Sequence, residues 1–169
     1  MRISDAIAKM IDSPHNSVHD IEHLLKVHSL ARCIGQLEGL DEQTLYTLEL
    51  AAVVHDISCP YLREKYHSAP GELQEKESCG YLREFFSGTD VAEEIVQRVC
   101  LLVSRHHTYH DIEGQDLQIL LEADFLVVAA EKHLPPSTVE NQGHKLFKTS
   151  AGLRFLNNLI LQLNLNTQE

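Results

Sequence analysis

Apolar residues recur at every third or fourth position along most of this chain, and that spacing is the feature that most constrains its fold. Isoleucines spaced four apart over Ile3–Ile11 predict a first short helix, which Ser13-Pro14 would end. The Val-rich runs at 52–54 and 127–128 lie inside longer helical patterns, and no segment alternates as a half-buried strand does. The sequence therefore predicts an all-α protein.

Turn residues divide the rest of the chain into further helices. Ser17-Val18-His19-Asp20 resembles a capping box, with Asp in place of Glu or Gln, and starts a second helix that Gly39 would end. Prolines break the pattern over 57–71, which predicts a loop or a short helix plus a loop, and Pro135, Pro136 and Gly143 interrupt the chain again. The remaining helices are expected over about 41–55, about 72–86, from Thr89 or Asp90 to Val103, about 117–130 and about 153–163.

One globular domain is expected, because 169 residues with 43% hydrophobic and 23% charged residues suit a single core. We assign residues 1–169 to one helical bundle, with its core over about 15–131. A C-terminal helical extension over about 144–165 would pack on that core or on a partner. A domain of this size buries roughly 70% of the surface of its unfolded chain, so a metal would serve chemistry rather than folding.

Charge and hydropathy exclude several classes of partner. The net charge of −11 argues against nucleic acid, because binding to phosphate backbones needs clustered cations. The longest apolar run, Phe125–Ala130, falls far short of the about 20 residues that cross a bilayer, so no membrane partner is expected. The N-terminus has no signal-peptide pattern, and the four cysteines form no C-x-x-C pair. These features predict a cytoplasmic protein with reduced thiols; a homodimer is left open.

Histidines and one acid in an apolar helix are the first indication of chemistry. The chain has 11 His beside 14 Lys plus Arg. Asp124 lies in a strongly apolar helix, where an unpaired carboxylate is costly; His55-Asp56 ends another such helix, and His23 precedes Leu24. Taken singly, an ion pair explains Asp124, and a hydrogen bond to a carbonyl explains His23. Together, two imidazoles and two carboxylates on separate helices predict a metal site inside a bundle.

The order His23, His55-Asp56, Asp124 resembles the signature of the HD domain superfamily of metal-dependent phosphohydrolases. The resemblance covers residues 19–131 approximately. Within the superfamily, the chain resembles small uncharacterised bacterial members. It implies a helical bundle of the HD type and assigns metal-ligand roles to these four residues. The implied cofactor is a divalent metal ion, one per chain or two, with Mn, Ni, Co, Mg, Zn and Fe all left open.

A second metal ion is suggested by the His-rich segment. His106-His107 resembles the paired histidines that help to hold a second ion in the HD-GYP phosphodiesterase branch. The further His of that branch is absent, and Glu75 or Glu77 could replace it because carboxylates suit Mg²⁺, Mn²⁺ and iron. The alternatives are a solvated helix face for the glutamates and, for the histidines, phosphate binding or a helix cap.

The resemblance implies hydrolysis of a phosphate ester or anhydride by metal-activated water, with a small phosphorylated substrate such as a nucleotide. Asp56 would bind the metal and orient the water, while Lys26, which matches a basic residue of the family, or His107 would neutralise developing charge. No general base is identified, because residues 57–60 contain no carboxylate. Two alternatives stay open: a di-iron oxygenase of the HD type, and a non-catalytic regulatory domain that binds metal or nucleotide.

Overall fold

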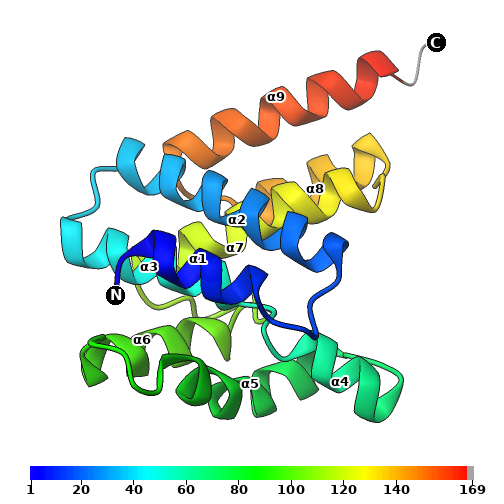
Figure 1. The fold of residues 1–169 in the computed structure, drawn as a ribbon. Helices are drawn as coiled ribbons and strands as arrows, with labels where there is room; N and C mark the ends of the chain where they lie inside the picture. Colours follow the sequence, from blue (N-terminus) through cyan, green and yellow to red (C-terminus); the bar gives the residue numbers. More distant parts are fainter. Residues whose placement is uncertain (167–169) are drawn as a thin grey trace.

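Helices form all the regular secondary structure of residues 1–166, the part of the chain that the computed structural model describes, with side chains through 163 (Figure 1). This confirms the all-α prediction. The helices are α1 (Ile3–Ile11), α2 (Val18–Leu37), α3 (Glu42–Val54), α4 (Cys59–Tyr66), α5 (Gly71–Phe86), α6 (Glu93–Val103), α7 (Gln115–Glu131), α8 (Pro136–Leu146) and α9 (Ser150–Asn166).

Side-chain caps start α2 and α3, the last two helices before the His-Asp pair. The predicted capping box forms at α2, where the Ser17 hydroxyl accepts from the Asp20 N–H and the Asp20 carboxylate accepts from the Ser17 N–H. Asp41 caps α3 by accepting a hydrogen bond of 2.9 Å from the N–H of Thr44. Each cap satisfies a backbone donor that the first helical turn leaves free, so the helix has a defined start.

The predicted cap of α6 is wrong. This helix begins at Glu93 after Ala92, which makes no side-chain cap, whereas Thr89 or Asp90 was expected there. The Thr89 hydroxyl instead donates to the carbonyl of Phe86, and the Asp90 carboxylate pairs with the chain's N-terminal ammonium group. Both side chains are therefore engaged elsewhere in the fold.

Prolines start helices at two places where the sequence pattern breaks. The segment after His55-Asp56 is a short helix plus a loop, because Pro60 lies in the first turn of α4, where its missing N–H costs nothing. In the same way Pro136 starts α8, a helix that the sequence reading missed by treating this stretch as an interruption. Gly143 lets α8 approach α9 closely, since a Cβ there would lie 2.6 Å from a methyl group of Leu156.

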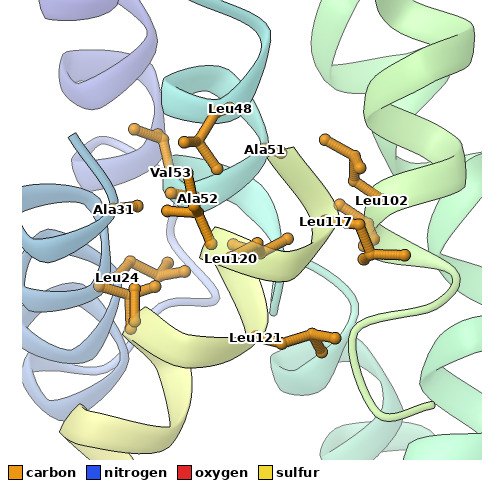
Figure 2. Packing of buried hydrophobic residues seen from close by; sticks show 14 of the residues in the cluster. Leu24, Ala31, Leu48, Ala51, Ala52, Val53, Leu102, Leu117, Leu120 and Leu121 are labelled. Atoms are coloured by element: carbon orange, nitrogen blue, oxygen red, sulfur yellow. The ribbon is translucent and has the colours of Figure 1, made fainter. Parts of the chain in front are cut away.

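The centre of the bundle is formed by α3 and α7. Helix α3 packs against α1, α2, α6 and α7, while α7 packs against α2, α3, α6, α8 and α9. Figure 2 shows buried apolar side chains that α2, α3, α6 and α7 contribute to this core, including Leu24, Ala31, Leu48, Ala52, Leu102, Leu117, Leu120 and Leu121. Polar groups carried by these two helices are therefore held inside the protein.

The C-terminal helices pack on the bundle through α7. Helix α9 contacts α2, α7 and α8, and the N–H of Ala151 donates to Glu38 at the end of α2. The carboxylate of Glu122 on α7 accepts from the backbone N–H groups of Lys148 and Thr149 just before α9 begins. All four cysteines are free thiols. Within the described residues, no helix combines the length and the apolar character that a membrane span requires.

Candidate metal centre

The predicted metal ligands come from four segments that the bundle brings together. His23 lies on α2, His55 and Asp56 directly follow α3, and Asp124 lies in the middle of α7. His106 follows the end of α6. Because α3 packs against all three of the other helices, its C-terminal end is the point at which these side chains meet.

Four side chains form what we call the inner cluster: His23, His55, Asp56 and Asp124. His23 Nε2 lies 3.2 Å from His55 Nε2. Asp124 Oδ1 lies 3.3 Å from the first of these nitrogens and 3.7 Å from the second. Asp56 Oδ2 lies 3.7 Å and 4.0 Å from the same two atoms. The structure thus brings together all four residues that were predicted as ligands of the first metal; ligation itself stays a prediction.

Asp56, His106 and His107 form a second group, the outer cluster. One ligand atom from each lies within 4.8 Å of the other two, and the inner trio of His23, His55 and Asp56 meets the same limit. His106 Nε2 lies 3.3 Å from Asp56 Oδ1. Asp56 therefore belongs to both clusters, with Oδ2 facing His23 and Oδ1 facing His106, so its carboxylate would be available to help hold an ion at either group.

Each of the four imidazoles uses one ring nitrogen for a hydrogen bond outside the clusters. His55 Nδ1 donates to the carbonyl oxygen of Ala52 at 2.9 Å, and His106 Nδ1 donates to that of Val103 at 2.6 Å. His107 Nε2 lies 3.1 Å from the amide oxygen of Gln74, and His23 Nδ1 lies 2.9 Å from Glu131 Oε2. Donation at one nitrogen leaves the lone pair of the other free for a metal.

Charges within the clusters are strongly coupled. Burial raises the pKa of Asp56, but His55, His106 and His23 outweigh it and hold that pKa well below its usual range. Burial lowers the pKa of His23, but Asp124, Asp56 and Glu131 outweigh it and raise that pKa to about 9. Ionised carboxylates therefore face a protonated ring. A divalent cation would replace such protons, and the N and O donors suit Mn, Fe, Co, Ni or Zn, so the residues fit a metal.

His107 differs from the other rings in its charge. Burial, followed by the neighbouring His106, lowers the pKa of His107 to about 4, so the ring is neutral at pH 7. A neutral imidazole can bind a metal but cannot neutralise charge on a phosphate. Gln74 orients this ring: its amide nitrogen donates to the carbonyl of Ala69, which turns its amide oxygen toward His107.

The remaining predicted residues lie around the clusters. Glu75 Oε1 accepts from the backbone N–H of His107 at 3.2 Å and from the Thr108 hydroxyl at 2.9 Å, so it holds the His-rich turn. Among the described side chains, no hydrogen bond or ion pair joins Glu77 to either cluster. Lys26 Nζ lies 3.0 Å from Glu131 Oε1 and 3.6 Å from Glu22 Oε2, so its ammonium group is already paired.

Sequence reasoning missed Gln74 and Glu131. Glu131 follows Asp124 by seven positions, which is two helical turns, so both side chains lie on one face of α7, and this spacing could have pointed to it. Gln74 carried no such signal, because its contact with His107 depends on how α5 packs beside the turn after α6.

Asp56 and His107 are the cluster residues that reach solvent. The Asp56 side chain is 28% exposed, whereas that of Asp124 is 8% exposed and those of His55 and His106 are fully buried. A groove of about 800 Å³ lies between α2 and α7; no residue of the inner cluster lines it, and its nearest link to the cluster is Glu131, which contacts His23. Lys26 and Glu131 line it together with apolar side chains such as Leu25, Leu30, Leu126 and Val127.

Comparison with known families agrees with this geometry. The HD domain family matches residues 20–141, a range that contains every residue of both clusters. A search of curated proteins found no match. Members of the HD domain superfamily are generally metal-dependent phosphohydrolases, and the four predicted ligands His23, His55, Asp56 and Asp124 lie within the matched range. The chain therefore belongs to the HD domain family.

Proposed function

We propose that this HD-domain protein is a metal-dependent phosphohydrolase that cleaves a phosphate ester or anhydride. The observation that carries the proposal is that His23, His55 and His106 each donate outward from one ring nitrogen and present the other toward Asp56 or Asp124. Orientation of this kind is typical of metal-ligating histidines. A bound divalent ion would supply Lewis-acid polarisation of the phosphoryl oxygen and of the attacking water.

Asp56 is the residue we propose to orient the water. Its carboxylate is ionised and is the most exposed of the acidic groups in the two clusters, so it can accept a hydrogen bond from a water molecule beside the substrate. The water oxygen then bonds to phosphorus, the bond from phosphorus to the leaving oxygen breaks, and the proton that the water loses passes through solvent to the leaving oxygen. His107, being neutral, would serve as a metal ligand. The negative carboxylates of Asp56 and Asp124 would attract the positively charged metal to the centre.

A small phosphorylated molecule, with nucleotides as the leading class, is the proposed substrate. The groove between α2 and α7 has a volume of about 800 Å³, within the range of small-molecule sites. Its apolar wall suits the organic part of such a molecule, and Glu131 in its lining contacts His23 of the inner cluster, which would take the phosphate. The net charge of −11 supports the proposal that nucleic acid is not the substrate.

Two ions are the form of the centre that the outer cluster favours. Because Asp56 faces both groups, the same residues also suit a di-iron oxygenase of the HD type, which is the alternative function. The two functions differ in what they consume. A phosphohydrolase uses water and releases phosphate or a phosphorylated product, whereas an oxygenase consumes O₂.

The test is phosphate release by the full chain loaded with Mn²⁺ or Fe²⁺, on a panel of nucleoside mono- and polyphosphates and simple phosphate esters. We expect hydrolysis by the wild type and by Asp12→Asn, a matched change at an exposed position. Asp56→Asn should lose more than the about 10- to 100-fold typical of residues outside the ligand sphere. Metal-loaded wild type that hydrolyses nothing on the panel would overturn the proposal, and O₂ consumption by the iron form would favour the alternative.

A further inference from the structure

Glu131, at the end of α7, connects two side chains of α2. Its Oε2 lies 2.9 Å from His23 Nδ1, and its Oε1 lies 3.0 Å from Lys26 Nζ. His23 and Lys26 are three residues apart, so they share one face of α2, and a single carboxylate can reach both. The Glu131 side chain is 15% exposed, so water competes little for its oxygens.

Glu131 is the only charged group among the acceptors that orient the four described cluster imidazoles. His55 and His106 donate to backbone carbonyls, and His107 donates to the amide of Gln74. A carboxylate forms a stronger, charge-assisted hydrogen bond than these neutral oxygens. It also makes the opposite ring nitrogen a better electron donor, here His23 Nε2, which faces His55 and Asp124.

We propose that Glu131 is a positioning residue that fixes His23 as the strongest imidazole ligand of the inner cluster, and that Lys26 acts through Glu131 rather than on substrate. The Lys26 ammonium group pairs with Oε1 of Glu131, while Oε2 of the same carboxylate accepts from the His23 ring. The sequence predicted that Lys26 neutralises charge on the phosphate. In the structure it is instead the outermost member of a series of contacts from Lys26 to Glu131 to His23. The inference rests on the proposed metal centre but not on the reaction performed there.

A purely structural role for the same contacts makes a different prediction. If Glu131 only ties α7 to α2, its removal lowers the free energy of unfolding and leaves metal affinity unchanged. If it positions His23, metal affinity falls even in a variant that keeps the fold. Glu131→Gln separates the two, because the amide keeps the size of the side chain and an acceptor oxygen but loses the charge.

The experiment measures Mn²⁺ affinity of the full chain from the electron paramagnetic resonance signal of free Mn²⁺, with urea unfolding of each metal-free variant alongside. We expect Glu131→Ala to weaken binding by about 10- to 100-fold, with Glu131→Gln and Lys26→Met between it and the wild type. Glu22→Gln is the control, because it removes only the exposed partner of Lys26, at 3.6 Å, and should bind as the wild type does.

A second measurement follows the His23 ring itself. In the Zn²⁺-loaded protein, ¹H–¹⁵N NMR should show a slowly exchanging proton on His23 Nδ1 in the wild type and its loss in Glu131→Ala. Unchanged Mn²⁺ affinity in both Glu131 variants would overturn the inference, whatever their stability. Wild type that binds Mn²⁺ but hydrolyses nothing would refute the proposed function and leave this inference standing, whereas wild type that binds no Mn²⁺ would refute both.

Discussion

Asp56 Oδ1 lies 3.3 Å from His106 Nε2, while the other oxygen of the same carboxylate faces the imidazole of His23. One aspartate thus joins the inner and outer clusters. The sequence neighbour of Asp56, His55, reaches only the inner cluster. The His-Asp pair therefore places adjacent residues in different roles, one serving a single group of ligands and the other serving both.

Removal of single ligands should give different metal counts. We expect Asp56→Ala to weaken binding of both ions, because both clusters use its carboxylate, whereas His107→Ala should retain one ion because the inner cluster is intact. Equilibrium dialysis against Mn²⁺, followed by metal analysis, measures the stoichiometry. Equal loss in the two variants would contradict a carboxylate shared between separate sites.

Gly71, the first residue of α5, controls the position of His107. A Cβ at Gly71 would lie 2.8 Å from Cδ2 of the His107 ring, so Gly71→Ala should displace the ring and weaken the second ion more than the first. Gly80, on the same helix, has no heavy atom within 4 Å of its Cβ position and provides the control. Gly80→Ala should leave metal binding unchanged and stabilise the protein by about 0.5–1 kcal/mol in urea unfolding. Identical metal titrations for the two variants would contradict the placement of His107.

Metal binding should release protons. Burial lowers the pKa of His23, but Asp124, Asp56 and Glu131 raise it to about 9, so below that pH the metal-free ring holds a proton that a metal must displace. We expect release of about one proton at pH 7 when an ion binds to the inner cluster, and an affinity of that cluster that rises as the pH approaches the pKa of this ring. Calorimetry in two buffers of different ionisation enthalpy measures the release. A metal affinity that is the same at pH 7 as at a pH near the pKa of His23 would contradict a protonated His23 ring in the metal-free protein.

The buried face of α7 carries much of the fold's stability. Leu120 is fully buried between α7 and its neighbours, so Leu120→Ala should lower the free energy of unfolding by about 2–5 kcal/mol. Leu161 on α9 is 60% exposed, and Leu161→Ala should change it by no more than about 0.5 kcal/mol. Urea denaturation of both variants measures the difference. Comparable values would show that the central position of α7 is incorrect.

Local patterns were sufficient to predict most helices and the four residues of the inner cluster. Apolar residues recur at helical spacing because each helix faces one core. An acid whose burial would be costly, such as Asp124, can be recognised from its apolar sequence neighbours alone. The errors arose where distant residues decide. Asp90 does not cap α6 because its carboxylate forms an ion pair with the N-terminal ammonium group of Met1, which is far away in sequence. Pro136 starts a helix because the residues after it pack on α7 and α9.

The groups that orient the ligands were the hardest part of the site to predict. Glu131 and Gln74 each act on a histidine from a different helix or turn, so their roles appear only once the helices are packed. The sequence shows which residues, such as His and Asp, could bind a metal. It does not show which polar side chain forms the hydrogen bond that orients each imidazole ring. Lys26 illustrates the same limit, since its partner Glu131 lies on the other side of the groove between α2 and α7.

The most direct test of a metal centre built from these residues is the metal content of purified protein, measured by mass spectrometry without added metal. Wild type and Asp56→Ala would be compared side by side. We expect one or two ions of Mn, Fe, Co, Ni or Zn per wild-type chain and a clear loss in the variant, because Asp56 belongs to both clusters. If neither protein retains metal, and reloading with Mn²⁺ restores none to the wild type, the clustered side chains do not form a metal site.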